Sequence, residues 1–222
     1  MGDFDLILAS NSPRRRELLA LTGWKFQVHP VEVDEVQITD EKPGHYVLRL
    51  AKAKAQACAD SSNTDITILA ADTAVVDRNV ILGKPRDIAD AKEMLVRLRG
   101  RTHRVYTGIA VLKKSIGRLV TELCITDVPM RDYSDKEMDV YIASGDPLDK
   151  AGAYAIQHPT FHPVMSLNGC YASVMGLPLC HLTRSLQKMD ITPKTVIPAK
   201  CQSGLGYTCS IFTAVLRGDQ VG

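Results

Sequence analysis

The sequence has few of the features that would place it outside the ordinary class of soluble globular proteins. None of its six cysteines forms a C-x-x-C pair, and most lie in apolar runs, where a free cysteine behaves as a small hydrophobic residue. No stretch approaches the roughly 18 consecutive apolar residues that predict a membrane span. The N-terminal residues lack the basic start and long apolar stretch of a signal peptide. We therefore expect a cytoplasmic protein with no membrane partner.

Charge of one sign is also scarce. The chain has 27 basic and 25 acidic side chains, so its net charge is only +2. This balance creates no general field for a polyanion, and the sequence predicts no nucleic-acid partner. Any anion must be bound by a local group of basic residues. The 222 residues, 45% of them hydrophobic, are enough to bury a full core.

The hydrophobic pattern predicts a mixture of strands and helices. Residues 4–9 form an apolar run typical of a buried strand, and capping and periodicity signals predict helices over 13–23, 43–59, 87–100, 134–144 and 176–188. Asp87 is the predicted cap of the third of these helices, and Ser134 with Glu137 forms a capping box at the start of the fourth. Two β-rich runs, 104–112 and 119–128, predict a long hairpin. Together these elements predict one α/β or α+β domain over residues 1–190.

The composition changes after Asp190 to proline, lysine, glycine and serine. We therefore treat residues 191–222 as a C-terminal extension of unknown role. It contains Cys201 and Cys209, and three interpretations are open: a disordered tail (our default as far as Thr208), a dimer contact or a weak metal site.

The segment Ser10-Asn11-Ser12-Pro13-Arg14-Arg15 carries the first chemical signal. Ser12 followed by a proline predicts the start of a helix directly after the first strand. Arg14, Arg15 and Arg16 then share the first helical turn, where the macrodipole disfavours cations by roughly 0.3–1 kcal/mol each. A bound anion would remove this conflict, and backbone N–H groups with the Ser10 and Ser12 hydroxyls would complete a phosphate pocket. The alternative is a solvated basic patch.

Two charged residues stand in otherwise apolar surroundings. Lys54 falls on the apolar face of the helix predicted from residue 43, where an inward-pointing ammonium needs an anionic partner; the alternative is a side chain that reaches solvent at the edge of that face. Asp72 interrupts the apolar run 68–76. A buried carboxylate must be ligated, hydrogen-bonded or catalytic, unless Asp72 lies in a turn at the end of the strand.

Three further patterns are weaker on their own. The acids of the segment 31–36 are suited to a hard divalent cation, although a solvated face is the default interpretation. Gly83-Lys84-Pro85 is a rigid turn that presents one lysine. His158 and His162 could suggest a metal pair, but the two prolines around them favour a plain loop.

In their order along the chain, these segments resemble the Maf family of nucleotide pyrophosphatases, first associated with septum formation. The resemblance covers about residues 5–188. The motifs that carry it are Ser10-x-Ser12-Pro13-Arg14-Arg15, Asp34-Glu35, Lys54, Ala71-Asp72-Thr73, Gly83-Lys84-Pro85, Lys150-Ala151-Gly152-Ala153-Tyr154-x-Ile156-Gln157 and Val174-x-Gly176-Leu177-Pro178-Leu179.

The resemblance implies an α/β fold like that of inosine-triphosphate pyrophosphatases, with a mixed twisted sheet, helices on its faces and a substrate cleft between two lobes. It also implies hydrolysis of a nucleoside triphosphate to the monophosphate and pyrophosphate with a divalent cation, Mg or Mn. Family members are often dimeric, so a homodimer is a further expectation.

The resemblance assigns roles by position. Asp72 corresponds to the general base and, with Glu35, to the metal-site carboxylates. The expected substrate contacts are Ser10, Ser12, Arg14, Arg15, Lys54 and Lys84.

Three positions distinguish two branches of the family. Arg14, Thr73 and Gln157 match the branch that is active on dTTP and UTP, and a glutamine amide can pair with the imide edge of a pyrimidine. Residues 158–163 depart from the glycine-rich segment that follows this glutamine in the family. Two alternatives stay open: a pyrophosphatase acting on 7-methyl-GTP or another modified nucleotide, and a non-enzymatic nucleotide-binding regulator of septum formation.

Overall fold

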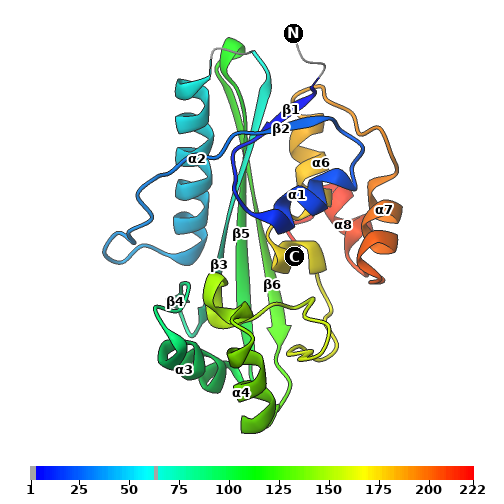
Figure 1. Cartoon of the computed structure of the whole chain (residues 1–222). Coiled ribbons are helices and arrows are strands. Elements are labelled where there is room, and N and C mark those ends of the chain that lie inside the picture. Colours follow the sequence, from blue (N-terminus) through cyan, green and yellow to red (C-terminus); the bar gives the residue numbers. More distant parts are fainter. Residues whose placement is uncertain (1–3, 63–64) are drawn as a thin grey trace.

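A computed structural model describes residues 4–62 and 65–222 (Figure 1). The expectation that no signal peptide is present rests partly on residues 1–3, which lie outside the described residues.

The centre of the molecule is a mixed sheet in the order β2-β1-β3-β5-β6, with β4 paired to β3. Strand β1 is parallel to β2 and β3, while β3 is antiparallel to β4 and β5, and β5 is antiparallel to β6. The strands are β1 (Leu6–Leu8), β2 (Phe26–Val28), β3 (Thr67–Asp77), β4 (Val80–Leu82), β5 (Thr102–Lys113) and β6 (Arg118–Pro129). The predicted α/β class and long hairpin are confirmed.

Helices cover both faces of this sheet (Figure 1). The α-helices are α1 (Pro13–Ala20), α2 (Pro43–Ser61), α3 (Ile88–Leu98), α4 (Asp135–Ala143), α5 (Tyr171–Met175), α6 (Leu179–Gln187), α7 (Ile197–Leu205) and α8 (Phe212–Arg217). Three short 3-10 helices are η1 (Lys114–Ile116), η2 (Asp146–Asp149) and η3 (Ala151–Ala153). The five predicted helices are confirmed, and each begins within three residues of its expected position.

The alternation of side chains along β3 decides which helix each residue meets, because successive strand residues point to opposite faces. Ile68 and Ala70 pack with α2 through Ala51 and Ala55. Residues 69 and 71 face the other way and join the core formed with α1 and α6. Asp72 therefore points toward α2, on the same face as Ile68 and Ala70.

Helix α2 lies unusually close to β5. A Cβ atom at Gly108 would stand 2.7 Å from the backbone oxygen of Val47, so only glycine permits this approach. The close packing holds the middle of α2 against the centre of the sheet.

A second group of elements forms the other end of the molecule, where α3 and α4 pack against the far ends of β3, β5 and β6 (Figure 1). Its core includes Leu95, Val105, Tyr133 and Met138. Asp87 caps α3 and Ser134 caps α4 with the full capping box, as the sequence predicted. The long strands thus connect two lobes.

Strand β3 has a stretch of open edge between the two lobes. Strand β1 pairs with residues 67–69, and β4 pairs with residues 75–77. Between these pairings the chain after β1 turns away into α1. On this edge the residues around Asp72 therefore border the space between the lobes, while on the other edge they pair with β5.

The helices of the C-terminal extension pack against α5 and α6. The expectation of a disordered tail is wrong for residues 197–205, which form α7, and α8 follows. Arg184 of α6 donates from Nη1 to the backbone oxygens of Val215 (3.0 Å) and Asp219 (3.1 Å). The same guanidinium pairs with the buried Glu122 of β6, so the extension surrounds an internal ion pair.

Candidate active site

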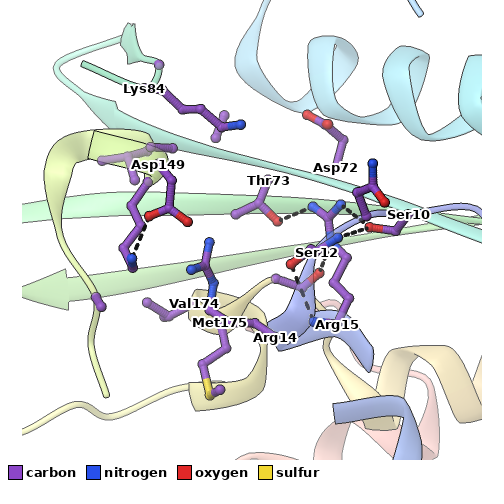
Figure 2. Close-up of a pocket in the computed structure, with 18 of the residues that line it drawn as sticks. Ser10, Ser12, Arg14, Arg15, Asp72, Thr73, Lys84, Asp149, Val174 and Met175 are labelled. Carbon is purple, nitrogen blue, oxygen red and sulfur yellow. Dashed lines mark hydrogen bonds and ion pairs between the residues drawn. The ribbon is translucent and has the colours of Figure 1, made fainter. Parts of the chain in front are cut away.

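A cavity of about 540 Å³ lies between the two lobes, beside the open edge of β3 (Figure 2). The structure brings every residue predicted for the site to its lining. These residues are Ser10, Ser12, Arg14, Arg15, Glu35, Lys54, Asp72, Thr73, Lys84 and Gln157. Their roles in binding or catalysis stay predictions.

The turn between β1 and α1 forms one wall of the cavity. Ser12 is the N-cap of α1, and its hydroxyl accepts a hydrogen bond from the Arg15 backbone N–H at 3.4 Å. The Ser12 backbone N–H in turn donates to Ser10 Oγ at 3.2 Å. The two serines therefore shape this turn as well as line the cavity.

Arg15 is fixed by contacts with three separate parts of the chain. Its Nε donates to the Gly176 backbone oxygen (3.0 Å), Nη1 to Ser10 Oγ (3.4 Å) and Nη2 to Thr73 Oγ1 (3.3 Å). Thr73 Oγ1 also lies 3.0 Å from Thr107 Oγ1. Because these contacts orient the guanidinium, it can meet an anion without first losing rotamer freedom. Arg14 extends from α1 into the same cavity (Figure 2).

Asp72 and Lys54 form an ion pair at the cavity floor. Lys54 Nζ lies 2.6 Å from Asp72 Oδ1, and the two side chains are only 12% and 10% exposed. The inward-pointing interpretation of Lys54 is thus confirmed, and Asp72 is in the middle of β3 rather than in a turn at its end. Burial raises the pKa of Asp72, while the nearby charges of Lys54 and Arg15 oppose this rise.

Glu35 meets the same ammonium from a loop. Its Oε1 lies 2.6 Å from Lys54 Nζ. The loop is held to α2 by two contacts: Tyr46 Oη donates to the Glu35 backbone oxygen (2.9 Å), and Arg49 Nη2 donates to that of Val36 (3.1 Å). The Glu35 side chain itself is more than half exposed to solvent.

The site fits a divalent cation by its donor set. Asp72 and Glu35 already converge on one cationic centre, the Lys54 ammonium. Magnesium is typically bound by one or two carboxylates together with substrate phosphates and water. Within the described ranges, no group of three or more His, Cys, Asp or Glu side chains has metal-site geometry.

The opposite wall comes from the turn that carries Lys84 and from η3. The Gly152 backbone N–H donates to the Gly83 oxygen at 3.0 Å, which joins the two segments. Gly152 has φ +69, and a Cβ there would lie 2.8 Å from Val75 Cγ1, so glycine is required. The hydrogen bond between Gly152 and Gly83 explains why Lys84, whose side chain is exposed, faces the cavity.

Sequence reasoning missed two charged residues of this wall. Lys150 is buried, and its Nζ donates to the Asp146 oxygen (2.6 Å), Asp146 Oδ1 (2.9 Å) and Asp149 Oδ1 (2.6 Å). Asp149 lines the cavity beside it (Figure 2). In the sequence, Lys150 begins the motif that ends in Gln157, and Asp149 directly precedes this motif.

Gln157 lies at the exposed rim of the cavity. The segment before it is anchored by Tyr141, whose Oη accepts from the Ala155 backbone N–H at 3.0 Å. The Tyr141 ring also stacks on Phe161 at 4.3 Å between centroids. His158 Nδ1 accepts from the Phe161 backbone N–H at 3.0 Å, so this histidine stabilises a loop. The loop interpretation of the histidine pair is confirmed.

A buried aspartate and several basic side chains around one cavity of an α/β fold are the arrangement expected of an enzyme that cleaves a phosphorylated substrate.

The chain belongs to the family described as Maf-like protein, whose model matches residues 5–189. It is 45% identical over 185 residues to a dTTP/UTP pyrophosphatase of Geotalea uraniireducens (strain Rf4), covering 83% of this chain and 95% of that protein. It is also 45% identical over 186 residues to a protein of the same name from Bacillus thuringiensis subsp. konkukian (strain 97-27), covering 84% and 96%.

Solved structures show more distant likeness. The Staphylococcus aureus Ham1 protein has a TM-score of 0.39 at 14% identity, covering 68% of this chain and 86% of that one. Protein VC0702 from Vibrio cholerae has a TM-score of 0.39 at 9% identity, covering 80% and 93%.

Across the described residues, no helix combines the length and apolar character needed to cross a bilayer.

Proposed function

We propose that this protein hydrolyses dTTP and UTP to the nucleoside monophosphate and pyrophosphate, and so removes these nucleotides from the cellular pool. The observation that carries the proposal is the convergence of the buried Asp72 and several basic side chains on one cavity. The names of the relatives that are 45% identical support the choice of substrate.

In this proposal Asp72 is the general base. Its carboxylate accepts a proton from a water molecule that attacks the α-phosphorus of the triphosphate, and the bond between the α-phosphorus and the bridging oxygen breaks. A base must be deprotonated at the working pH and still have appreciable proton affinity. The opposing effects of burial and of Lys54 on the pKa of Asp72 suit this requirement.

The departing pyrophosphate gains negative charge as this bond breaks. Arg14, Arg15 and Lys84 line the cavity from two walls and would stabilise this charge, together with the Ser10 hydroxyl. The hydrogen bonds of Arg15 to Ser10 and Thr73 orient its guanidinium, so little reorganisation is needed. Ser12 would contribute mainly through the shape of the turn.

A divalent cation, Mg or Mn, completes the proposal. Glu35 and Asp72 would hold it, and when bound it would neutralise phosphate charge. Both carboxylates pair with the Lys54 ammonium, which offsets part of their mutual repulsion.

Selection of the pyrimidine is assigned to Arg14, Thr73 and Gln157. The exposed amide of Gln157 can donate to and accept from the imide edge of a pyrimidine at the cavity rim. Thr73 contacts Arg15 directly, so its effect on selection would pass through the position of that guanidinium.

The decisive experiment is an assay of pyrophosphate release over dTTP, UTP, 7-methyl-GTP and other triphosphates with magnesium or manganese. We expect dTTP and UTP to be the preferred substrates. Preference for 7-methyl-GTP would replace the substrate assignment, and nucleotide binding without any turnover would favour a regulator.

Asp72→Asn tests the mechanism. We expect turnover to fall by at least about 100-fold, the usual contribution of a positioned base, while nucleotide affinity stays largely intact. Asp127→Asn is the matched control, because Asp127 is an exposed aspartate on β6. Wild-type turnover in Asp72→Asn would remove Asp72 from the mechanism.

The proposal assigns this activity to residues 1–190 and leaves residues 191–222 as an extension of the domain. It places the protein in the cytoplasm, where nucleotide pools are held. It also includes a homodimer, which a sedimentation experiment would detect or exclude.

A further inference from the structure

A second, much smaller cavity of about 20 Å³ lies between α5, α6 and α7. It shares no lining residue with the larger cavity between the two lobes. Four of the six cysteines line it: Cys170, Cys180, Cys201 and Cys209. The space admits little more than one water molecule, so it is too small for an organic ligand. What distinguishes it is the concentration of thiols.

Cys201 and Cys209 are brought together by a local turn. Gly206, with φ +59, ends α7, and the Tyr207 backbone N–H then donates to the Gln202 oxygen at 3.2 Å. The Cys209 backbone N–H donates to Gln202 Oε1 at 3.0 Å. The chain after α7 thus folds back over the helical turn that contains Cys201, and both thiols face the same cavity.

The remaining contacts hold this turn in place. Tyr207 Oη donates to the backbone oxygens of Leu167 (3.0 Å) and Gly169 (3.0 Å). Its ring lies 5.3 Å from that of Tyr171 between centroids. The turn is therefore docked against the start of α5, which fixes the segment that carries Cys209 beside α7.

Exposure separates this pair from the other two thiols. Cys170 and Cys180 are each only 8% exposed, whereas Cys201 and Cys209 are both half-buried. Burial also raises the pKa of Cys180 to about 12 and, together with Cys209, that of Cys201 to about 11, so little of either thiol is present as the reactive thiolate. A reagent from solvent therefore reaches the pair Cys201 and Cys209 first.

We propose that Cys201 and Cys209 are a reversible oxidation site, which forms an intramolecular disulfide with small oxidised thiols such as oxidised glutathione. The Cys209 thiolate, on the loop, attacks one sulfur of the oxidant, and the first glutathione thiol leaves. The Cys201 thiolate then attacks the Cys209 sulfur of the mixed disulfide, and the second glutathione leaves. Two protein thiols are oxidised and one small disulfide is reduced to two thiols.

The position of this bond gives it a defined effect. It would close the loop that carries residues 202–208 and tie the start of the α7–α8 connection to α7. Disulfides inside cells are usually transient and redox-sensing, which matches a pair that also stays packed when reduced.

The test uses the full-length protein, treated with oxidised glutathione, then denatured and labelled with N-ethylmaleimide. Residues 201–217 form one tryptic peptide, because Lys200 and Arg217 bound it, and it contains both cysteines and no others. We expect this peptide to lose two hydrogens in mass and to carry no label. The intact protein should carry four labels instead of six.

Three variants sharpen the result. Cys201→Ser and Cys209→Ser should each abolish the bond, and Cys58→Ser, which removes a buried thiol of α2 outside this cavity, should form it as the wild type does. Reduction with dithiothreitol should restore six labels. A bond that includes Cys170 or Cys180, a lasting glutathione adduct or six labels after oxidation would overturn the assignment.

Discussion

The ion pair between Lys54 and Asp72 sets the proton affinity of the proposed base, and Lys54→Met is the perturbation that tests this. Methionine keeps the length and apolar stem of the side chain but removes the ammonium. Lys54 is the largest influence that opposes the effect of burial on the pKa of Asp72. Without it, this pKa must rise, because the buried carboxylate loses its closest cation.

The distance fixes the scale of the effect. Unit charges 2.6 Å apart attract by about 1.6 kcal/mol at the dielectric constant of water and by roughly 6 kcal/mol at an effective value near 20. Glu35 shares the ammonium, and Arg15 remains after the substitution, so the lower part of this range applies. A loss of about 1.4–2.8 kcal/mol of this attraction penalises the charged carboxylate and so raises the pKa of Asp72.

The assay is the pH dependence of kcat/KM for pyrophosphate release at a fixed magnesium concentration, since this profile reports the free enzyme's essential base. Activity falls as Asp72 becomes protonated, so a higher pKa moves the acidic limb of the profile to higher pH. The control is Lys52→Met, because Lys52 lies on the same helix but is exposed. An acidic limb that stays in place in a folded Lys54→Met protein, or moves equally in the control, would refute the reasoning.

Three further outcomes follow from particular contacts. Gln157→Glu should weaken selection for dTTP in competition assays, and an unchanged profile would exclude the amide from recognition. Arg184→Met leaves Glu122 buried with only Lys188 as a cationic partner, so the free energy of unfolding should fall by about 3 kcal/mol and Tm by roughly 6–12 °C. The control Arg217→Met removes an exposed arginine and should change Tm little. Burial lowers the pKa of His103 to about 4, so the free energy of unfolding should drop by up to about 3 kcal/mol as pH falls from 6.5 toward 4. Urea unfolding should show this drop in the wild type and should not show it in His103→Gln.

Much of the local structure could be predicted from the sequence. The Ser12 cap, the capping box at Ser134 and the hairpin of β5 and β6 were all predicted, because such signals act between residues close in the chain. Asp72 stood out because one carboxylate in an apolar run needs a partner wherever it lies. The family resemblance, carried by the order of the motifs, then indicated which residues to group.

The extension shows where sequence reasoning failed. Its proline, glycine and serine content favoured disorder up to Thr208, yet α7 forms there. Gly204 allows this packing, since a Cβ at that position would stand 2.7 Å from the Leu21 side chain. The reason is tertiary: a surface offered by α1 and α6 stabilises a helix that its own composition does not predict.

The sequence by itself predicted the α/β class, five of the helices, the long hairpin and the ten side chains that the structure places around the cavity between the lobes. Only the tertiary structure decided which atoms meet. Arg15 and Gly176 are 161 residues apart, and Lys54 meets both Glu35 and Asp72, because β1 leaves β3 before the aspartate and α2 lies across the sheet at that level. Cys170 and Cys180 likewise meet Cys201 and Cys209 at the small cavity only through the packing of α5, α6 and α7. Contacts of this kind depend on strand order and helix packing, which no local pattern in the chain specifies.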